Sequence, residues 1–283
     1  MAKHEASESM FVLLTGAGYT GRRILSMLPA DSVAALSRSR VDTDRQLFPF
    51  DLDSASELPL ELPARYAVIY TVPPSGEPPD ERLQTFLSLV SPARFIYIST
   101  TGVYGDYGGQ TVTEASALKP SNRQAANRVA AEELLTTWSR QNDVALIVLR
   151  APGIYGPGRL GTERIRSGTP AIAEVDANPG NRIHVDDLAR CCVAALDENV
   201  PAGIYNVGDG DHRSPTAFTN EVARQLDLPA PPQISRAEAQ QQFSRQRMAF
   251  LSDSRIVDTT KMREVLGVIP LYANPEDGIR ASL

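Results

Sequence analysis

A glycine-rich loop between an apolar run and a helical pattern constrains this chain more than any other feature. The loop follows the apolar run 10–14, and Gly16, Gly18 and Gly21 give it the spacing G-x-G-x-x-G. Such glycines permit a tight turn, let the backbone approach a pyrophosphate and let the helix pack on the strand. The free N–H groups at the start of the helix then face the anion. The loop therefore predicts a dinucleotide-binding site, and the alternative is a glycine-rich turn that holds no ligand.

The bulk composition excludes several classes of protein. The chain has 283 residues, of which 42% are hydrophobic, which suffices for one large α/β domain or for one domain with a smaller lobe. The formal net charge is −6 and no basic run occurs, so we expect no nucleic-acid partner. No apolar stretch approaches the ~20 residues of a membrane span. Residues 1–9 lack the apolar core of a signal peptide. We therefore expect a cytoplasmic protein without a membrane partner.

The cysteines and histidines do not form a recognisable metal motif. Cys191 and Cys192 are adjacent, so they point in different directions on a helix, and we interpret them as buried packing residues in a reducing compartment. His4, His184 and His212 are scattered along the chain. We therefore expect no bound metal.

Apolar runs alternate with helical patterns along the chain. Candidate strands cover 11–15, 32–36, 67–72, 95–99, 144–150 and 203–207, and candidate helices cover 82–90, 122–140 and 186–197. Continuous apolar strands separated by helices indicate a parallel sheet that is covered on both faces. The predicted fold is α/β, a Rossmann-type doubly wound parallel sheet with a smaller C-terminal substrate lobe.

The character of the sequence changes after residue 150, which predicts two units. Residues 151–181 are rich in glycine and proline, and residues 209–283 mix short helices with irregular stretches. We assign residues 1–153 and 182–208 to an NAD(P)-binding Rossmann domain. Residues 154–181 and 209–283 then form a smaller substrate-binding lobe that closes over the cofactor.

The residues after the second predicted strand bear on the choice of dinucleotide. NAD-binding units of this kind usually carry an acidic residue ~20 positions beyond the loop, which binds the ribose 2′-hydroxyl. Here that region holds Arg38, flanked by Ser37 and Ser39, and no carboxylate. A guanidinium fork suits a 2′-phosphate, so NADP is preferred over NAD, although a solvated loop arginine is the alternative. Asp51 is a candidate acceptor for the adenine amine, and an exposed loop aspartate is the alternative there.

Four further stretches, together with the glycine loop, carry a family resemblance. They are residues 99–105 (STTGVYG), 149–159 (LRAPGIYGPGR), 181–189 (NRIHVDDLA) and 204–208 (IYNVG). In order and spacing the chain resembles an extended short-chain dehydrogenase/reductase of the NAD-dependent epimerase/dehydratase type, over nearly its whole length.

The resemblance implies hydride transfer aided by a Ser or Thr, a Tyr and a Lys. Thr100 matches the hydroxyl residue, which hydrogen-bonds the reacting oxygen. On the following helix Gln124 stands at the Tyr position and Arg128 at the Lys position, so the Tyr-x-x-x-Lys pair is absent. Glutamine cannot exchange a proton as a general acid or base, whereas arginine can still hold a ribose hydroxyl. The chain thus resembles the atypical branch that keeps the fold and loses this pair.

The resemblance also implies the other residues of the site. The expected cofactor-binding residues beyond the three glycines, Arg38 and Asp51 are Tyr19, Thr20, Val72, Pro73, Ser99 and Pro152. The expected substrate-binding residues are Tyr155, Arg159, Arg182 and Arg255, with Arg166 as a further candidate for an anion-binding cleft. Solvated surface arginines are the alternative for the basic residues.

Other side chains are candidates for replacing the missing tyrosine. Tyr104 follows Thr100 on the same loop and is a catalytic candidate, although a packing tyrosine is the favoured alternative. Tyr107 lies on a glycine-rich loop that can enter the cleft. His184 titrates near neutrality, but a structural role before a helix capped by Asp186 or Asp187 is favoured.

Two functions from different classes remain open. The first is an NAD(P)-dependent oxidoreductase or epimerase with a non-standard active site, acting on a small polar substrate such as a nucleotide sugar. The second is a non-catalytic NADP(H)-sensing or regulatory module, which the missing Tyr–Lys pair suggests. The resemblance also makes a homodimer through helix 122–140 an expectation.

Overall fold

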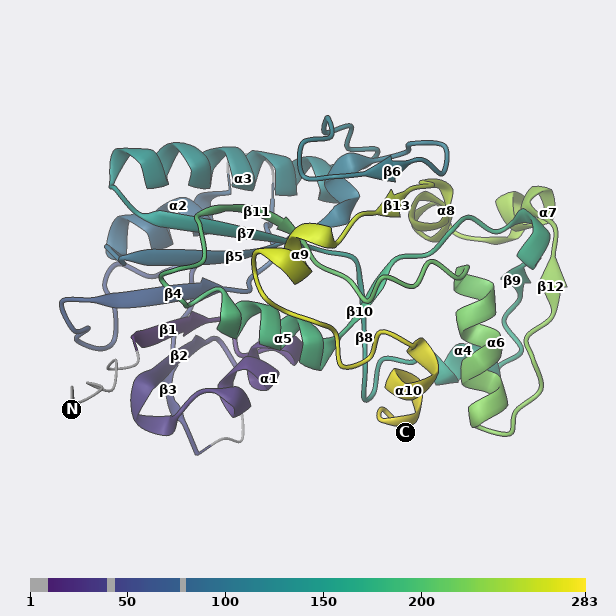
Figure 1. The fold of residues 1–283 in the computed structure, drawn as a ribbon, viewed down its shortest axis with the longest axis horizontal. Coiled ribbons are helices and arrows are strands. Elements are labelled where there is room, and N and C mark those ends of the chain that lie inside the picture. The colour runs from purple at the N-terminus through teal and green to yellow at the C-terminus, as the bar shows by residue number, and fades with distance from the viewer. Residues whose placement is uncertain (1–9, 40–43, 77–79) are drawn as a thin grey trace.

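A seven-stranded parallel sheet forms the centre of the larger unit (Figure 1). The computed structural model describes residues 10–39, 44–76 and 80–283, so His4 and the N-terminal segment 1–9 lie outside it. The strand order is β11-β7-β5-β4-β1-β2-β3. The strands are β1 (Phe11–Thr15), β2 (Val33–Ser37), β3 (Gln46–Pro49), β4 (Tyr66–Tyr70), β5 (Arg94–Thr100), β7 (Ala145–Ala151) and β11 (Gly203–Asn206). All their pairings are parallel, which confirms the predicted α/β doubly wound fold.

Helices cover both faces of this sheet, as Figure 1 shows. Helices α1 (Tyr19–Met27) and α5 (Val185–Ala194) lie on one face, where Ile24 and Leu188 join one hydrophobic core. Helices α2 (Glu81–Leu89) and α3 (Arg123–Gln141) cover the other face, where Phe86 and Leu135 join a second core. The central strands are buried on both sides because each face carries its own helix layer. All five residues of β4 are buried.

The six predicted strands agree with six strands of this sheet to within two residues at each end, whereas the seventh strand of the sheet and the short strands outside it were not predicted. Strand β3 was not expected, because its four residues are half-buried or exposed and show no continuous apolar run. It lies at the edge of the sheet, next to β2. Pro49 is tolerated there because no further strand needs its missing N–H group.

A smaller unit lies to the right of the sheet in Figure 1 and has a core of its own. Tyr155, Leu160, Ile165, Val222 and Ile279 are buried together in it. Its helices are α4 (Thr162–Arg166), α6 (Pro215–Gln225), α7 (Arg236–Gln242), α8 (Arg245–Ser252) and α10 (Pro275–Arg280). Its strands pair in short parallel ladders, β8 (Gly153–Tyr155) with β10 (Arg182–His184), and β9 (Ala171–Ile172) with β12 (Gln233–Ile234).

Several connections tie the C-terminal part of the chain back to the larger unit. Strand β13 (Ile256–Val257) pairs with β6 (Thr111–Val112), which follows β5 in the chain. Helix α9 (Thr260–Glu264) places Met262 in the same core as α5, together with Val268. Part of the segment 209–283 therefore packs on the sheet instead of on the smaller unit's core. The described part of the chain also contains three short 3-10 helices, η1 (Ala30–Ser32), η2 (Thr101–Tyr104) and η3 (Glu174–Asp176). The domain boundaries themselves stay a prediction.

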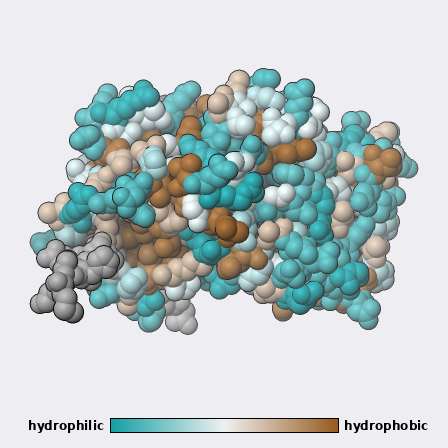
Figure 2. Space-filling view, in the orientation of Figure 1, coloured by the Kyte–Doolittle hydropathy of each residue, from teal (hydrophilic) through white to brown (hydrophobic). Residues whose placement is uncertain are grey.

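The surface and the helix lengths add two observations. On the face seen in Figure 2, hydrophilic side chains cover most of the smaller unit, whereas hydrophobic ones gather beside the sheet. Among the described residues, no helix is long and apolar enough to cross a membrane. The same residues contain no group of three or more histidine, cysteine or acidic side chains that suits a metal ion.

Candidate functional site

The glycine loop joins β1 to α1 with the geometry of a pyrophosphate cradle. Gly16 has φ +98° and donates its N–H to Leu36 O at 2.9 Å, which fixes the turn beside β2. A Cβ at Gly21 would lie 2.0 Å from Gly16 O, so only glycine lets α1 pack this closely. A Cβ at Gly18 would meet nothing within 4 Å. Gly18 therefore faces open space, and packing does not require it to be glycine.

The first turn of α1 is left without a capping anion of its own. Gly18 is the N-cap residue and offers no side-chain hydrogen bond, and no acidic residue lies in the first turn. The N–H groups of this turn, which includes Tyr19 and Thr20, thus face the open side of the loop. These features fit the pyrophosphate of a dinucleotide, which would be held by Gly18 and the N-terminal turn of α1.

The residues proposed for the adenosine half lie at the carboxyl ends of β2 and β3. Arg38 is exposed one residue beyond β2. The hydrogen bond from Arg82 lowers the pKa of Asp53, and the charge of Arg38 adds to this effect more weakly. Asp51 is exposed, and its side chain accepts the N–H of Asp53 at 3.2 Å. Val72 lies against the loop, since a Cβ at Gly16 would come within 3.0 Å of its side chain.

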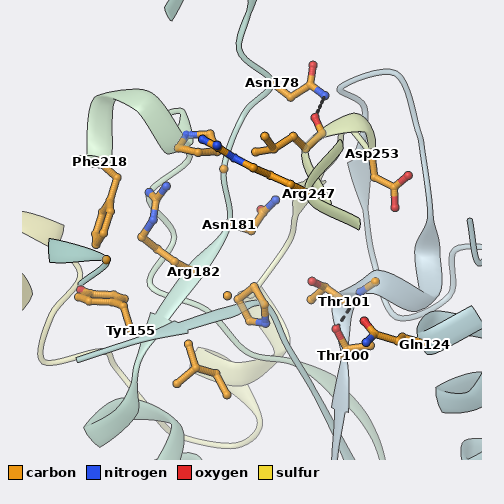
Figure 3. Close-up of a pocket in the computed structure, with 18 of the residues that line it drawn as sticks. Thr100, Thr101, Gln124, Tyr155, Asn178, Asn181, Arg182, Phe218, Arg247 and Asp253 are labelled. Atoms are coloured by element: carbon orange, nitrogen blue, oxygen red, sulfur yellow. Dashed lines mark hydrogen bonds between the residues drawn. The ribbon is translucent and has the colours of Figure 1, made fainter. Parts of the chain in front are cut away.

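A cavity of about 930 Å³ opens between the sheet edge and the smaller unit. Thr100, Thr101 and Gln124 lie at one side of it, and Tyr155, Arg182 and Phe218 lie at the other (Figure 3). Pro73 and Pro152 also line it, as does Arg128. The structure thus brings together residues from the ends of β4, β5 and β7 with residues from the smaller unit.

Thr100 and Gln124 form the side of the cavity next to the sheet. Thr100 ends β5, and its Oγ1 accepts the N–H of Gly102 at 3.1 Å, which leaves the hydroxyl proton available for another acceptor. Gln124 lies in the first turn of α3, and Figure 3 shows its amide beside Thr100. The side chain of Asn122 caps this helix by accepting the N–H of Ala125 at 3.0 Å. The cap fixes the position of Gln124 in the cavity wall.

Arg128 is anchored one turn further along α3. Its Nη1 donates to Tyr97 Oη at 3.0 Å and to Ile98 O at 2.7 Å, both on β5. The guanidinium also lies 5.6 Å from the centroid of the Tyr97 ring. Two hydrogen bonds to one strand hold the charge against the sheet edge.

A buried polar network lies beneath Thr100 and includes two expected site residues. Arg150 and Glu132 form a buried ion pair at 2.6 Å, and Arg150 also donates to Tyr104 Oη at 2.9 Å. Tyr104 Oη donates to Asn206 Oδ1 at 2.7 Å, and Ser99 Oγ donates to Glu132. Burial raises the pKa of Tyr104 in spite of the nearby arginine. Neither Tyr104 nor Ser99 lines the cavity, because both hydroxyls point into this network.

The other two candidate tyrosines do not face Thr100 either. Tyr107 Oη donates to Ala117 O at 2.7 Å, and the residue does not line the cavity. Tyr155 lines it with its ring, which contacts His184 and Phe218 edge-on. Its hydroxyl is buried and has no hydrogen-bond partner among the described residues. Burial raises the pKa of Tyr155, so the phenol stays protonated at neutral pH.

His184 has a structural position. Its Nδ1 accepts the N–H of Asp186 at 3.2 Å, and its Nε2 lies 3.1 Å from Ser282 Oγ. His184 itself is therefore the N-cap of α5, a role that the sequence suggested for Asp186 or Asp187. Asp187 instead accepts the N–H groups of Leu271 and Tyr272.

Arginine is the dominant charged residue of the cavity. Among the described lining residues, Asp253 is the one carboxylate. The same residues include eight arginines, which are Arg123, Arg128, Arg159, Arg164, Arg182, Arg236, Arg247 and Arg255. Arg166, an expected member, does not line the cavity. It lies two residues after Arg164 on α4, and that spacing points two side chains to different sides of a helix.

Three of these arginines are fixed by hydrogen bonds within the smaller unit. Arg182 is buried, donates to Arg213 O at 2.9 Å and lies 4.6 Å from the centroid of Phe218. Arg247 stacks on the ring of Phe243 and donates to Pro170 O at 2.7 Å. Arg236 donates to Asp176 O at 2.7 Å. Burial lowers the pKa of Arg182 and of Arg247, which is the cost of holding these charges in a partly closed space.

Arg255 and Asp253 line the cavity, and Asp253 lies on the side where β5 ends. Arg255 Nη1 donates to Gly105 O at 2.7 Å and lies 3.4 Å from Asp253 Oδ2. The same carboxylate oxygen accepts from Ser121 Oγ at 2.8 Å. Figure 3 shows Asp253 on the side of Thr100 and Thr101. The carboxylate is thus held in place through one oxygen.

Several cavity residues were missed at the sequence level, among them Arg164, Arg236, Arg247, Asn181 and Asp253. Arginine is frequent between residues 236 and 255, and that frequency was the available signal. The packing of α7 and α8 over the cavity was not apparent from local pattern. Conversely, Arg159, Arg182 and Arg255 were expected and do line the cavity.

The comparisons with known proteins agree with this architecture. Residues 81–208 match the model of the NAD dependent epimerase/dehydratase family. The matched segment makes up slightly less than half of the chain and is similar to this family, in agreement with the resemblance to the extended short-chain dehydrogenases/reductases. It is 29% identical, over 219 residues, to a dTDP-glucose 4,6-dehydratase of Neisseria gonorrhoeae. That match covers 72% of this chain and 60% of the dehydratase, so the chain spans about 60% of its relative's length.

Two solved structures show the same fold over almost the whole chain. A conserved protein of unknown function from Silicibacter pomeroyi is 26% identical, with a TM-score of 0.80, and covers 96% of this chain and 97% of its own. MoeE5 in complex with UDP-glucose and NAD is 20% identical, with a TM-score of 0.75, and the match covers 96% of this chain and 97% of MoeE5.

Proposed function

We propose that the protein is an NAD(P)-dependent oxidoreductase or epimerase that acts on a nucleotide sugar. The observation that carries this proposal is the cavity, with Thr100 on one side and fixed arginines on the other. A hydroxyl that can donate to a reacting oxygen suits the sugar, and arginines suit a diphosphate. The names of the dehydratase relative and of the MoeE5 complex support the same class of substrate.

In this proposal, each polar residue of the cavity has its own role in the reaction. A bound nicotinamide would supply the hydride acceptor. Thr100 donates its hydroxyl proton to the reacting oxygen, and Arg128 holds the ribose at the edge of β5. Gln124 orients a polar group through its amide without exchanging a proton. Among the described residues that line the cavity, Asp253 carries the one carboxylate, so Asp253 and water serve as the proton acceptors in this proposal.

We further propose NADP as the preferred cofactor. The exposed guanidinium of Arg38 at the end of β2 supports this preference, because a 2′-phosphate offers it a bidentate partner. The nearby carboxylate of Asp53 is already hydrogen-bonded by Arg82, which leaves Arg38 free for a phosphate. The homodimer expected from the resemblance stays a prediction.

The test is turnover of a panel of nucleotide sugars with both cofactors. Nicotinamide absorbance and sugar products must both be followed, because an epimerase can regenerate its cofactor. Thr100→Val should lower kcat by about a hundredfold and leave the cofactor Kd unchanged, since it removes a donor at the reacting oxygen alone. Cofactor-saturated protein that yields neither product nor absorbance change with any substrate would contradict the proposal.

A second candidate function has its own observation. Gln124 stands where a proton-transferring phenol is expected, and no tyrosine hydroxyl faces Thr100 within the described part of the chain. A sensor of NADP(H) needs no such group. It should bind the oxidised and reduced cofactors with different affinities or change its oligomeric state between them. Calorimetry and light scattering with both forms separate this candidate from the enzyme.

A further inference from the structure

The stacking of Arg159 on Tyr19 joins the glycine loop to the wall of the cavity. Tyr19 is the first residue of α1, and the Arg159 guanidinium carbon lies 3.9 Å from the centroid of its ring. Arg159 lies in the turn between β8 and α4, where its N–H donates to Gly156 O at 2.9 Å. A residue of the smaller unit thus stands over the helix turn that faces the cofactor pyrophosphate.

Tyr19 is held in a notch that a side chain at position 156 would fill. Gly156 has φ +148°, and a Cβ there would lie 2.5 Å from Tyr19 Oη and 2.7 Å from Val185 Cγ1. The hydroxyl is buried and has no hydrogen-bond partner among the described residues. Burial raises the pKa of Tyr19, so its ring remains a neutral platform for the guanidinium. The space beside Gly156 fixes the position of the Tyr19 ring, and the ring in turn fixes the position of the Arg159 guanidinium.

The charge of Arg159 is not neutralised by any described neighbour. No ion pair and no side-chain hydrogen bond connects it to another residue within 10–39, 44–76 and 80–283. On the same face, Arg23 of α1 is paired with Asp186 at 2.8 Å. The guanidinium of Arg159 therefore keeps its N–H groups for a ligand.

We propose that Arg159 is a second ligand of the cofactor pyrophosphate, and that Tyr19 is the positioning residue that holds it there. The proposal rests on the cofactor part of the proposed function. The first turn of α1 supplies backbone N–H groups from one side, and Arg159 adds a charged, bidentate donor from the smaller unit. Arg159 is thereby assigned to the cofactor, whereas the sequence placed it with the substrate.

This assignment links the cofactor to the smaller unit. Leu160 follows Arg159 directly and is buried in the core with Tyr155 and Ile165. A pyrophosphate held by Arg159 therefore fixes a loop that leads straight into that core. Cofactor binding then orders the cavity wall before the substrate enters.

The experiment is calorimetry of NADP⁺ and of adenosine 2′-monophosphate with the full chain. The second probe has no pyrophosphate and reports on the Arg38 end alone. Arg159→Met, which keeps an apolar stem and removes the charge, should weaken NADP⁺ binding about tenfold to a hundredfold. It should leave the affinity for adenosine 2′-monophosphate unchanged. Arg166→Met is the matched control, because this exposed arginine lies outside the cavity.

Tyr19→Leu tests the positioning role separately. It should weaken NADP⁺ binding less than Arg159→Met does, and in the Arg159→Met background it should add little, because both substitutions then act through one charge. Thermal unfolding of each variant checks that the chain folds.

Four outcomes would overturn the proposal. In the first, Arg159→Met binds NADP⁺ as tightly as the unaltered chain. In the second, both probes weaken equally, which indicates a general electrostatic effect. In the third, Tyr19→Leu adds its full effect to Arg159→Met, which removes the positioning role. In the fourth, the unaltered chain binds neither NADP⁺ nor NAD⁺, and then the cofactor part of the proposed function fails as well.

Discussion

Gln124 and Arg128 show how two substitutions change what a familiar site can do. Both lie on the cavity side of α3, one turn apart, beside the end of β5 that carries Thr100. Gln124 keeps hydrogen-bonding capacity but cannot ionise, and Arg128 keeps a charge that it does not release. In the proposed function, the pair therefore orients a substrate and a ribose and does not exchange protons with them. In that function a proton that moves at Thr100 leaves through the carboxylate of Asp253 or through water.

Asp209 is a second residue whose ionisation matters, here for stability. It is buried behind Arg182, one carboxylate oxygen accepts the N–H of Asp211 at 2.9 Å, and the other has no partner among the described residues. Burial raises the pKa of Asp209 from its ordinary value of 3.8 to about 7, against the opposing charge of Arg182. The folded chain thus binds a proton that the unfolded chain releases between these two pH values.

Because the folded chain holds this proton to a higher pH than the unfolded chain does, ionisation of Asp209 makes the stability depend on pH. The free energy of unfolding falls as pH rises from about 4 to about 7, and the loss is complete above that window. Its size is on the order of 4 kcal/mol. Asp209→Asn keeps the acceptor for Asp211 and removes the charge, so it should stabilise the chain at pH 8 much more than at pH 4.5.

Urea unfolding of both proteins at the two pH values measures this gain. Asp31→Asn is the control, because Asp31 is exposed. An equal gain from Asp209→Asn at pH 4.5 and pH 8 would show that Asp209 is already ionised in the fold.

At the scale of the element, two glycines of the β1–loop–α1 unit have different roles, one in packing and one in the proposed binding of the cofactor. A Cβ at Gly21 would collide with Gly16 O, whereas a Cβ at Gly18 would enter open space. Gly18 has φ −76°, which alanine adopts without strain. Gly18→Ala should therefore change the free energy of unfolding by less than about 1 kcal/mol. It should still weaken NADP⁺ binding at least about tenfold, because the methyl group stands where the backbone must approach the pyrophosphate.

Gly21→Ala is the matched variant of the same loop. It should destabilise the fold by about 1–3 kcal/mol or more, because α1 must move away from β1. Calorimetry and urea unfolding of the two variants give the comparison. If Gly18→Ala left NADP⁺ affinity unchanged, the loop would be a turn without a ligand.

The central elements were predictable from the sequence for a physical reason. Strands such as β1 and β4 are buried on both faces, so burial alone dictates continuous apolar runs such as Phe11–Thr15. Strand β3 escaped prediction because an edge strand with exposed residues carries little of that signal. The site shows the same limit, since Tyr104 and Thr100 are four residues apart. One hydroxyl faces a buried arginine and the other faces the cavity, and only tertiary packing decides between them.

At the scale of the whole molecule, the cavity collects residues that are far apart in the chain. Thr100 ends a sheet strand, Arg182 belongs to β10, and Arg247 comes from α8 near the C-terminus. No local pattern links these segments, so their convergence was not predictable. The contact of Arg159 with Tyr19 was not predictable for the same reason, because it joins residues 140 positions apart.

The distribution of charge over the molecule supplies the last prediction. The chain as a whole carries a net charge of −6, yet eight arginines and one aspartate line the cavity. An anionic ligand such as UDP is thus repelled weakly at long range and attracted strongly inside the cavity. UDP should bind more tightly than uridine. Its Kd should rise several-fold between 50 and 300 mM salt, because screening acts within about 10 Å at 0.1 M. Uridine binding should hardly depend on salt.

Arg247→Met should reduce UDP affinity about tenfold, because it removes a fixed charge from the cavity wall, and Arg166→Met should not. Thermal shift gives an independent reading, since a ligand at a hundred times its Kd stabilises the folded chain by about 2.7 kcal/mol. Equal affinities for UDP and uridine would mean that the arginines serve the fold and not a phosphate. Because the chain's overall charge disfavours anions, a salt-sensitive preference for UDP can only arise locally, at the arginine-lined side of the cavity.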